Sequence, residues 1–284
     1  MKILIAGCGY LGTALGGRLT AAGHEVWGIR RSPEGLKLLE MFHIHPVRAD
    51  LNVPKTLRNL PQVDQVVFCQ APANKNDSYR RTYMEGTRKL LAALKGERLQ
   101  KILFISSTSV YAQKDGSWVD EKTKTGEKDK TDETARLNAE FLLEAEKAVA
   151  ESGRPYAILR LAGLYGPRRH RLRPLREGKI KPVFSELYTN RIHLEDAVSA
   201  AQLLLQKEAN GIFLGADDEP STQKEFYSWI CERLGLPLGA SEEGKPPHGS
   251  NKRCSNAKLK KLGLTLRYPS YREGYAPLIA EEMA

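Results

Sequence analysis

Three glycines near the start of the chain have the spacing of a phosphate-binding turn. Gly7, Gly9 and Gly12 form the pattern G-x-G-x-x-G between an apolar run at 2–6 and a helical pattern at 12–22. The first glycine permits a tight turn, the second lets a pyrophosphate approach, and the third lets the helix pack on the strand. The helix N-terminus adds unpaired N–H groups and partial positive charge. We predict that a dinucleotide contacts Gly7, Gly9, Tyr10, Leu11 and Gly12; a turn without a ligand is the alternative.

Two arginines indicate which dinucleotide the protein binds. A carboxylate after the second strand would bind the ribose hydroxyls of NAD. The apolar run at 25–29 is instead followed by Arg30 and Arg31. Guanidinium groups bind phosphate through two parallel hydrogen bonds, which suits the 2′-phosphate of NADP. The sequence therefore favours NADP over NAD, with a pair of solvated arginines as the alternative.

Two further strand ends carry polar residues. Asp50 and Leu51 follow the third predicted strand, where the Asp50 carboxylate would accept a hydrogen bond from an adenine amino group. Gln70 and Ala71 end the fourth strand, where the backbone would pass under a ribose. We predict cofactor contacts at all four residues, with an ordinary turn as the alternative for Asp50.

The elements that position these residues alternate between strands and helices. Further strands are predicted at 63–69, 101–106 and 156–161, and helices at 77–95 and 129–151. This alternation is typical of a parallel sheet covered on both faces. Polar or Gly/Pro/Ser-rich composition predicts a mobile loop at 114–130 and another loop at 239–255, with helices at 221–234 and 256–262.

Composition narrows the class of protein. The chain has 284 residues, of which 41% are hydrophobic and 27% charged, so we expect a globular protein. Its net charge of +10 indicates an anionic ligand or partner. The four cysteines show no metal-ligand spacing, and neither a secretory segment nor an apolar run of about 18 residues is present. We therefore expect a cytoplasmic protein with reduced thiols, no metal and no membrane partner.

The positive charge is concentrated in one segment. Residues 168–181 hold five Arg and two Lys against one Glu. We predict that Arg168 and Arg169 bind an anionic small-molecule substrate; a solubilising loop is the alternative. Nucleic acid is disfavoured, because no aromatic residues interleave with the basic ones.

Longer motifs resemble the extended short-chain dehydrogenase/reductases of the NAD-dependent epimerase/dehydratase superfamily. Residues 104–111, Phe-Ile-Ser-Ser-Thr-Ser-Val-Tyr, are similar to its strand-five segment, and residues 159–167 to its R-x-x-x-x-Y-G-P segment. Residues 190–197 are similar to its R-(I/V)-H-(V/L)-x-D-A segment. The resemblance covers about residues 1–210.

The resemblance implies an α/β fold: a doubly wound parallel-sheet Rossmann fold with a small C-terminal substrate-binding lobe. The NAD(P)-binding domain would span 1–165 and be completed by 190–215, and the lobe would comprise 166–189 and 216–284. It implies cofactor contacts at Ser106, Leu161 and Ala162, and substrate contacts at Thr108 and Arg191. Ser107 matches the family's strand-five hydroxyl, although a hydroxyl that only bonds backbone is the alternative.

This sequence departs from the family at the Tyr-x-x-x-Lys pair. Its Tyr falls on Asp132 and its Lys on Arg136. Arg136 would still donate to ribose hydroxyls, or it would form a plain salt-bridge ladder with Asp132 and Glu140. Tyr111 is then the first candidate to supply the proton together with Ser107, and Tyr165 the next; either would otherwise be a packed aromatic. Alternatively, the substrate needs no acid from the protein.

Together these features predict an NADP-dependent oxidoreductase or epimerase-like enzyme of an atypical kind. Its substrate would be small and anionic, with a phosphorylated or nucleotide-linked sugar as one option. A catalytically silent NAD(P)-binding regulator is the rival hypothesis. By analogy with the family, the helices at 77–95 and 129–151 would form a homodimer.

Overall fold

The structure is a computed structural model of the chain. It describes residues 1–284 except 73–77, 95–97, 127–132, 180–182, 245–249 and 284. The chain forms two compact units. The first unit comprises 1–110, 136–160 and 198–213, and the second comprises 111–135, 161–197 and 214–284. The second unit includes 111–135, 161–165, 190–197 and 214–215, which the sequence analysis assigns to the nucleotide-binding domain.

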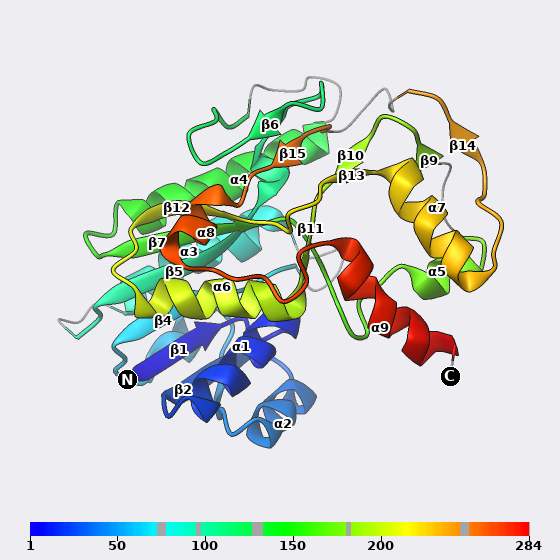
Figure 1. Ribbon diagram of the computed structural model, residues 1–284. Coiled ribbons are helices and arrows are strands. Elements are labelled where there is room, and N and C mark those ends of the chain that lie inside the picture. Colours follow the sequence, from blue (N-terminus) through cyan, green and yellow to red (C-terminus); the bar gives the residue numbers. More distant parts are fainter. Residues whose placement is uncertain (73–77, 95–97, 127–132, 180–182, 245–249, 284) are drawn as a thin grey trace. The chain divides into compact units, whose positions relative to one another are not determined.

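A seven-stranded sheet in the order β12-β7-β5-β4-β1-β2-β3 is the centre of the fold (Figure 1). The five strands from β5 to β3 pair in parallel. This sheet confirms the predicted α/β fold class. Its strands are β1 (Lys2–Ala6), β2 (Glu25–Arg30), β3 (His45–Arg48), β4 (Gln65–Phe68), β5 (Lys101–Ser107), β7 (Tyr156–Leu161) and β12 (Gly211–Gly215).

Side chains of β1 explain why both faces of the sheet are covered. Leu4 belongs to a core that also contains Leu90 and Val149 of the helices α3 and α4. Its neighbour Ile5 lies on the opposite face of the sheet, against α1. An added Cβ at Gly16 of α1 would lie 3.3 Å from the Ile5 side chain. Successive side chains of a strand alternate between faces, so a continuous apolar run requires helices on both. The helices of this part are α1 (Tyr10–Ala21), α2 (Pro33–Met41), α3 (Gly86–Ala93), α4 (Glu133–Ala150) and α6 (Leu194–Gln206), with the shorter turns η1 (Pro54–Leu57), η2 (Arg80–Glu85) and η3 (Thr108–Val110).

The second unit packs short strands and helices around aromatic side chains. Its core includes Tyr165, Phe226, Tyr271 and Tyr275. The strands pair as β8 with β11, β10 with β13, β9 with β14 and β6 with β15. They are β6 (Trp118–Val119), β8 (Gly163–Tyr165), β9 (Val183–Phe184), β10 (Tyr188–Thr189), β11 (Arg191–His193), β13 (Ser221–Thr222), β14 (Ser241–Glu242) and β15 (Arg253–Cys254); the helices are α5 (Leu172–Arg176), α7 (Gln223–Leu234), α8 (Ala257–Leu262) and α9 (Tyr271–Met283).

Two segments predicted as loops contain strands. Within the described part of 114–130, β6 pairs with β15, which itself lies inside the predicted loop 239–255. Val119 of β6 and Cys254 of β15 are almost fully buried. One apolar side chain in a polar segment is enough to pin a two-residue strand, which composition alone does not reveal.

Candidate functional site

The glycine turn joins β1 to α1 and is closely packed. Gly7 has a φ of +85°, and an added Cβ there would lie 2.4 Å from the Cα of Gln70. An added Cβ at Gly12 would lie 2.8 Å from the carbonyl oxygen of Gly7. These two glycines are therefore required by the backbone itself, whatever binds to the turn.

Gly9 is different, because the protein leaves space above it. An added Cβ there would meet nothing closer than Arg30 Nη1, at 3.7 Å. Gly9 caps α1 without any side-chain hydrogen bond to the first amides, and the first turn holds no acidic residue. The first N–H groups of an α-helix have no carbonyl partner within the helix itself. The turn fits an anionic group that approaches the backbone, as a dinucleotide pyrophosphate does.

The guanidinium of Arg30 extends from the end of β2 beside this space. It lies near Gly9 on one side and Gly35 on the other, where an added Cβ would be 2.5 Å from its Nε. Gly35 is in the first turn of α2, whose N-cap Ser32 accepts a hydrogen bond from the Gly35 N–H at 3.2 Å. Within the described ranges no carboxylate is paired with Arg30. The neighbouring Arg31 is exposed. Gly35 is a site residue that the sequence analysis missed.

Asp50 follows β3 and organises its own turn. Its carboxylate accepts from the Asn52 N–H at 2.8 Å, and its N–H donates to the Thr56 hydroxyl at 3.0 Å. Leu51 is buried in the core of the first unit. One Asp50 oxygen is thus engaged in an ordinary Asx turn, and the other is left to accept from a ligand.

Gln70 follows β4 and carries an unsatisfied buried oxygen. Its amide donates to the Thr87 hydroxyl at 2.9 Å, but its carbonyl oxygen has no partner among the described residues. Gln70 is 9% exposed, so this oxygen lacks bulk water as a substitute donor. A ribose hydroxyl is a donor of the required kind. The next residue, Ala71, is exposed.

Ser106, at the end of β5, belongs to a buried ion-pair network. Its hydroxyl donates to Glu146 at 2.6 Å, and Glu146 accepts two bonds from Arg160 at 3.0 and 2.6 Å. The Arg160 and Glu146 side chains are 4% and 6% exposed. The Ser106 proton is therefore used inside the first unit, and only its lone pairs remain for a cofactor.

Ser107 is better placed to donate. Its hydroxyl oxygen accepts from the Ser109 N–H at 3.1 Å. Since no described acceptor takes its O–H, that proton is left for a ligand. Thr108, the next residue, is buried at 8% exposure.

The helix α4 carries Arg136, the residue aligned with the family's lysine. Its guanidinium donates to Glu140 at 2.8 Å, one turn further along the helix. This is the i,i+4 pair that the sequence offered as the simple alternative. Asp132, at the position of the family's tyrosine, lies outside the described residues.

Tyr111 is fully buried in the second unit. Its hydroxyl donates to the carbonyl oxygen of Asp120 at 2.8 Å. A phenol whose proton is held by a backbone carbonyl favours the packed-aromatic interpretation over proton supply. Burial also raises the pKa of Tyr165, the second candidate, far above that of a free phenol.

Two pairs of predicted residues in the second unit differ in exposure. Leu161 and Ala162 are buried, and the Ala162 N–H donates to Gly215 at 2.9 Å. Arg168 and Arg169 are exposed at a tight turn in which Arg168 has a φ of +62°. Their guanidinium groups are accessible to an anion.

Arg191 has the opposite environment. It is 8% exposed, and it donates to the hydroxyls of Ser221 at 3.0 Å and Thr189 at 2.7 Å while lying 3.6 Å over the ring of Phe226. The nearby Asp217 is buried, which raises the pKa of its carboxyl well above the usual value, against the lowering effect of Arg191. Arg191 is therefore integrated into the core of this unit rather than presented at a surface.

Comparison with known proteins places the chain in a family. The model described as the NAD dependent epimerase/dehydratase family matches residues 3–213. The chain belongs to this family. The predicted resemblance is thereby confirmed, and membership supports a nicotinamide cofactor and an oxidoreductase or epimerase-like enzyme.

Individual known proteins are similar to this one over most of the chain. A solved structure named as an NAD-dependent epimerase/dehydratase, from Methylobacillus flagellatus, is 35% identical with a TM-score of 0.81, and the match covers 100% of this chain and 99% of that one. Protein YeeZ of Escherichia coli strain K12 is 28% identical, over 94% of this chain and 96% of YeeZ. A 3-diazoavenalumate denitrifying reductase of a Streptomyces species is 26% identical, over 84% of this chain and 83% of the reductase.

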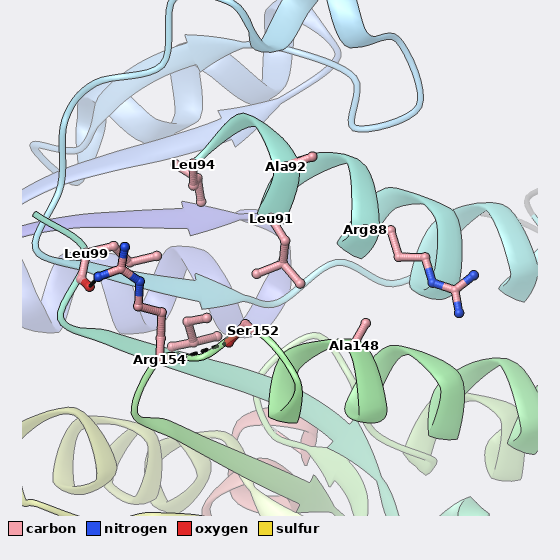
Figure 2. A pocket seen from close by; sticks show the side chains of 9 residues that line it. Arg88, Leu91, Ala92, Leu94, Leu99, Ala148, Ser152 and Arg154 are labelled. Atoms are coloured by element: carbon pink, nitrogen blue, oxygen red, sulfur yellow. Dashed lines mark hydrogen bonds between the residues drawn. The ribbon is translucent and has the colours of Figure 1, made fainter. Parts of the chain in front are cut away.

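A separate pocket of about 330 Å³ lies between α3 and α4 (Figure 2). Its lining includes Leu91 of α3 and Ala148 of α4, together with Leu99 and Ile102 at the amino end of β5. The glycine turn follows the carboxyl end of β1, which runs in the same direction, so this pocket is at the opposite edge of the sheet. These are the helices through which the sequence predicts a homodimer, which stays a prediction.

The described residues include no helix that is both long and apolar enough to cross a membrane.

Proposed function

We propose that this member of the epimerase/dehydratase family is an NADP-dependent oxidoreductase or epimerase-like enzyme that acts on a small anionic substrate. The observation that supports NADP is the position of Arg30. Its guanidinium lies at the end of β2 between Gly9 and the first turn of α2, without a carboxylate partner among the described residues. A 2′-phosphate would supply the missing negative charge and accept bidentate hydrogen bonds.

Several described residues would hold the cofactor. The N–H groups at the start of α1 would bind the pyrophosphate, Gln70 would accept from a ribose hydroxyl, and Asp50 would accept from the adenine amino group. When bound, a nicotinamide cofactor supplies hydride exchange with a substrate carbon.

Ser107 would orient the substrate. Its oxygen accepts from the Ser109 N–H, and no acceptor among the described residues takes its O–H, so the O–H would donate to a substrate carbonyl or hydroxyl oxygen. Positioned proton transfer is typically worth about 10²–10⁴-fold in rate. The exposed Arg168 and Arg169 would attract an anionic group of the substrate.

The direct test is turnover. Wild-type protein is mixed with NADPH and a panel of small carbonyl compounds that includes carboxylates, sugar phosphates and nucleotide sugars, and loss of the reduced nicotinamide absorbance is followed. We expect Ser107→Ala to lower kcat by about 10²-fold or more. Ser109→Ala, which keeps the backbone N–H that Ser107 accepts, is the matched control and should retain kcat.

One observation favours a catalytically silent regulator. The side chains of Tyr111, the first candidate to supply the proton, and of Arg136, which aligns with the family's lysine, are bonded inside the chain. If the protein binds NADPH but oxidises none of it over the whole panel, the regulator is the better account. Turnover that depends on Ser107 excludes it.

A further inference from the structure

Lys252, in the second unit, carries a buried ammonium group that the sequence did not single out. The residue is 5% exposed. Its Nζ donates to the carbonyl oxygen of Tyr111 at 3.1 Å and to the hydroxyl of Ser250 at 2.8 Å. An ammonium has three N–H donors. One donor is therefore left without an acceptor among the described residues.

The chain around Lys252 is fixed from two sides. Asn190 donates to the Lys252 carbonyl at 2.9 Å and accepts from the Cys254 N–H at 2.7 Å. The Asn251 N–H donates to Gln113 at 2.7 Å. The ammonium is thus presented by a segment that is tied to its neighbours before and after Lys252, as a binding group requires.

The charge of Lys252 is not compensated. Both partners of its Nζ are neutral oxygens, and no carboxylate of the described residues forms an ion pair with it. Burial lowers the pKa of Lys252, and among the described residues the thiol of Cys254 acts in the opposite direction. A buried cation is costly unless an anion accompanies it. An anion from outside the chain would remove this cost.

We propose that Lys252 binds a carboxylate group of the substrate. A carboxylate has one negative charge, which matches one ammonium with one open N–H. A phosphate is usually held by a guanidinium fork or several donors, and Arg191, another buried cation of this unit, is already bonded to Ser221 and Thr189.

That the bound carboxylate belongs to a substrate rests on the proposed function, whereas the carboxylate site at Lys252 does not. Combined with hydride exchange, the site indicates a small oxo or hydroxy carboxylic acid, of which a uronic acid is one form. This narrows the anionic substrate from phosphate-bearing compounds to carboxylic acids.

The first test observes Lys252 directly. In full-length protein with ¹³C-labelled lysine, the Cε resonance of Lys252 is assigned by its absence in Lys252→Arg. Glucuronate, pyruvate, glucose and inorganic phosphate are then titrated separately, with NADPH present and absent. We expect a saturable shift of this resonance with at least one of the two carboxylates and none with glucose or phosphate. The absence of a carboxylate-induced shift, or an equal shift with phosphate, overturns the proposal.

The second test compares two buried lysines. Lys252→Met removes the charge at similar volume, and Lys101→Met is the matched control, because Lys101 is also buried but donates to the Lys207 carbonyl in the first unit. We expect the carboxylate affinity to fall about tenfold or more in Lys252→Met and to be unchanged in Lys101→Met. Equal affinity in Lys252→Met and wild type contradicts the proposal. If Lys252→Met does not fold, the carboxylate-induced shift of the Lys252 resonance in wild type alone decides whether the proposal holds.

The outcome is separable from that of the proposed function. NADPH affinity, measured on Lys252→Met, should equal that of wild type. If NADPH fails to bind wild type while carboxylates still shift Lys252, the proposed function is wrong and the carboxylate site stands. If NADPH is oxidised only with substrates that lack a carboxylate, the proposed enzymatic function is supported and the carboxylate site at Lys252 is contradicted.

Discussion

The guanidinium of Arg30 occupies the space that a side chain at Gly35 would need. An added Cβ at Gly35 would lie 2.5 Å from Nε and 3.1 Å from Cζ of Arg30. The position of the arginine at the end of β2 thus depends on a glycine five residues later, in the first turn of α2. This relationship allows the arginine to be displaced without removing its charge.

Gly35→Ala should therefore weaken NADPH binding while leaving NADH binding unchanged. The methyl group displaces the Arg30 guanidinium, and we expect the Kd for NADPH to rise about tenfold. The thermal midpoint should stay equal or rise slightly, because Ala favours a helix over Gly by up to about 1 kcal/mol. Calorimetric titration with the two cofactors measures the effect. A parallel loss of NADPH and NADH affinity would mean that the turn itself had been damaged.

Gly9→Ala and Gly12→Ala should separate ligand binding from folding. At Gly9 an added Cβ meets nothing closer than Arg30 Nη1, at 3.7 Å, so we expect unchanged stability and at least about tenfold weaker dinucleotide binding. At Gly12 it would lie 2.8 Å from a backbone oxygen, so we expect a lower free energy of unfolding. Urea denaturation and NADPH titration of both variants make the comparison. Wild-type NADPH affinity in Gly9→Ala would show that no ligand approaches there.

Much of the first unit was predictable from sequence because its signals are local. The run at 2–6 and the three glycines determine a strand, a turn and a helix within twenty residues, and the predicted strand and helix agree with β1 and α1. The side-chain partners were not predictable. Glu146 and Arg160 lie on α4 and β7, and only the packed sheet brings them to Ser106.

The Ser106–Glu146–Arg160 network should matter for stability. Glu146→Gln leaves the Arg160 cation buried without its carboxylate, and we expect a loss of about 3–5 kcal/mol in the free energy of unfolding. Ser106→Ala should cost about 1 kcal/mol. Arg88→Ala, which breaks the exposed pair with Glu144, is the control and should cost less than about 1 kcal/mol. Urea denaturation gives all three values. If Ser106→Ala chiefly weakens NADPH binding, the hydroxyl serves the cofactor as the sequence suggested.

His193 should make the protein less stable in acid. Burial lowers the pKa of His193 to about 4, in contact with the rings of Tyr165 and Tyr268. The unfolded imidazole titrates near 6.5. Between these values the unfolded state binds a proton that the folded state does not, so the stability present above about pH 6.5 is lost as the pH falls. The loss approaches about 3 kcal/mol near pH 4.

Comparison with His193→Gln isolates this contribution. The raised pKa values of Asp196 and Asp217 act in the opposite sense, because those carboxyls favour the folded state at low pH, and they are common to both proteins. The free energy of unfolding is measured against pH for each. Wild type should show a steeper fall from about pH 6.5 to 4 than the variant. Parallel curves would contradict a buried neutral imidazole.

The second unit was harder to predict, since its segments are short and distant in sequence. Residues 239–255 read as a loop because Gly, Pro and Ser dominate, yet Lys252 and the strand β15 lie there. The family motif predicts that Arg191 binds the substrate. Its partners Ser221 and Phe226, about thirty residues later, are what bury it.

The most direct test of the central claim is a set of calorimetric titrations of NADPH and NADH into wild type, Arg30→Ala and Arg88→Ala. Arg88→Ala removes the same charge from α3, where the exposed Arg88 pairs with Glu144. We predict that wild type and Arg88→Ala bind NADPH at least about tenfold more tightly than NADH, and that Arg30→Ala loses this preference while keeping its NADH affinity. Equal or tighter NADH binding by wild type, or an unchanged preference in Arg30→Ala, would contradict the assignment of Arg30 to the 2′-phosphate.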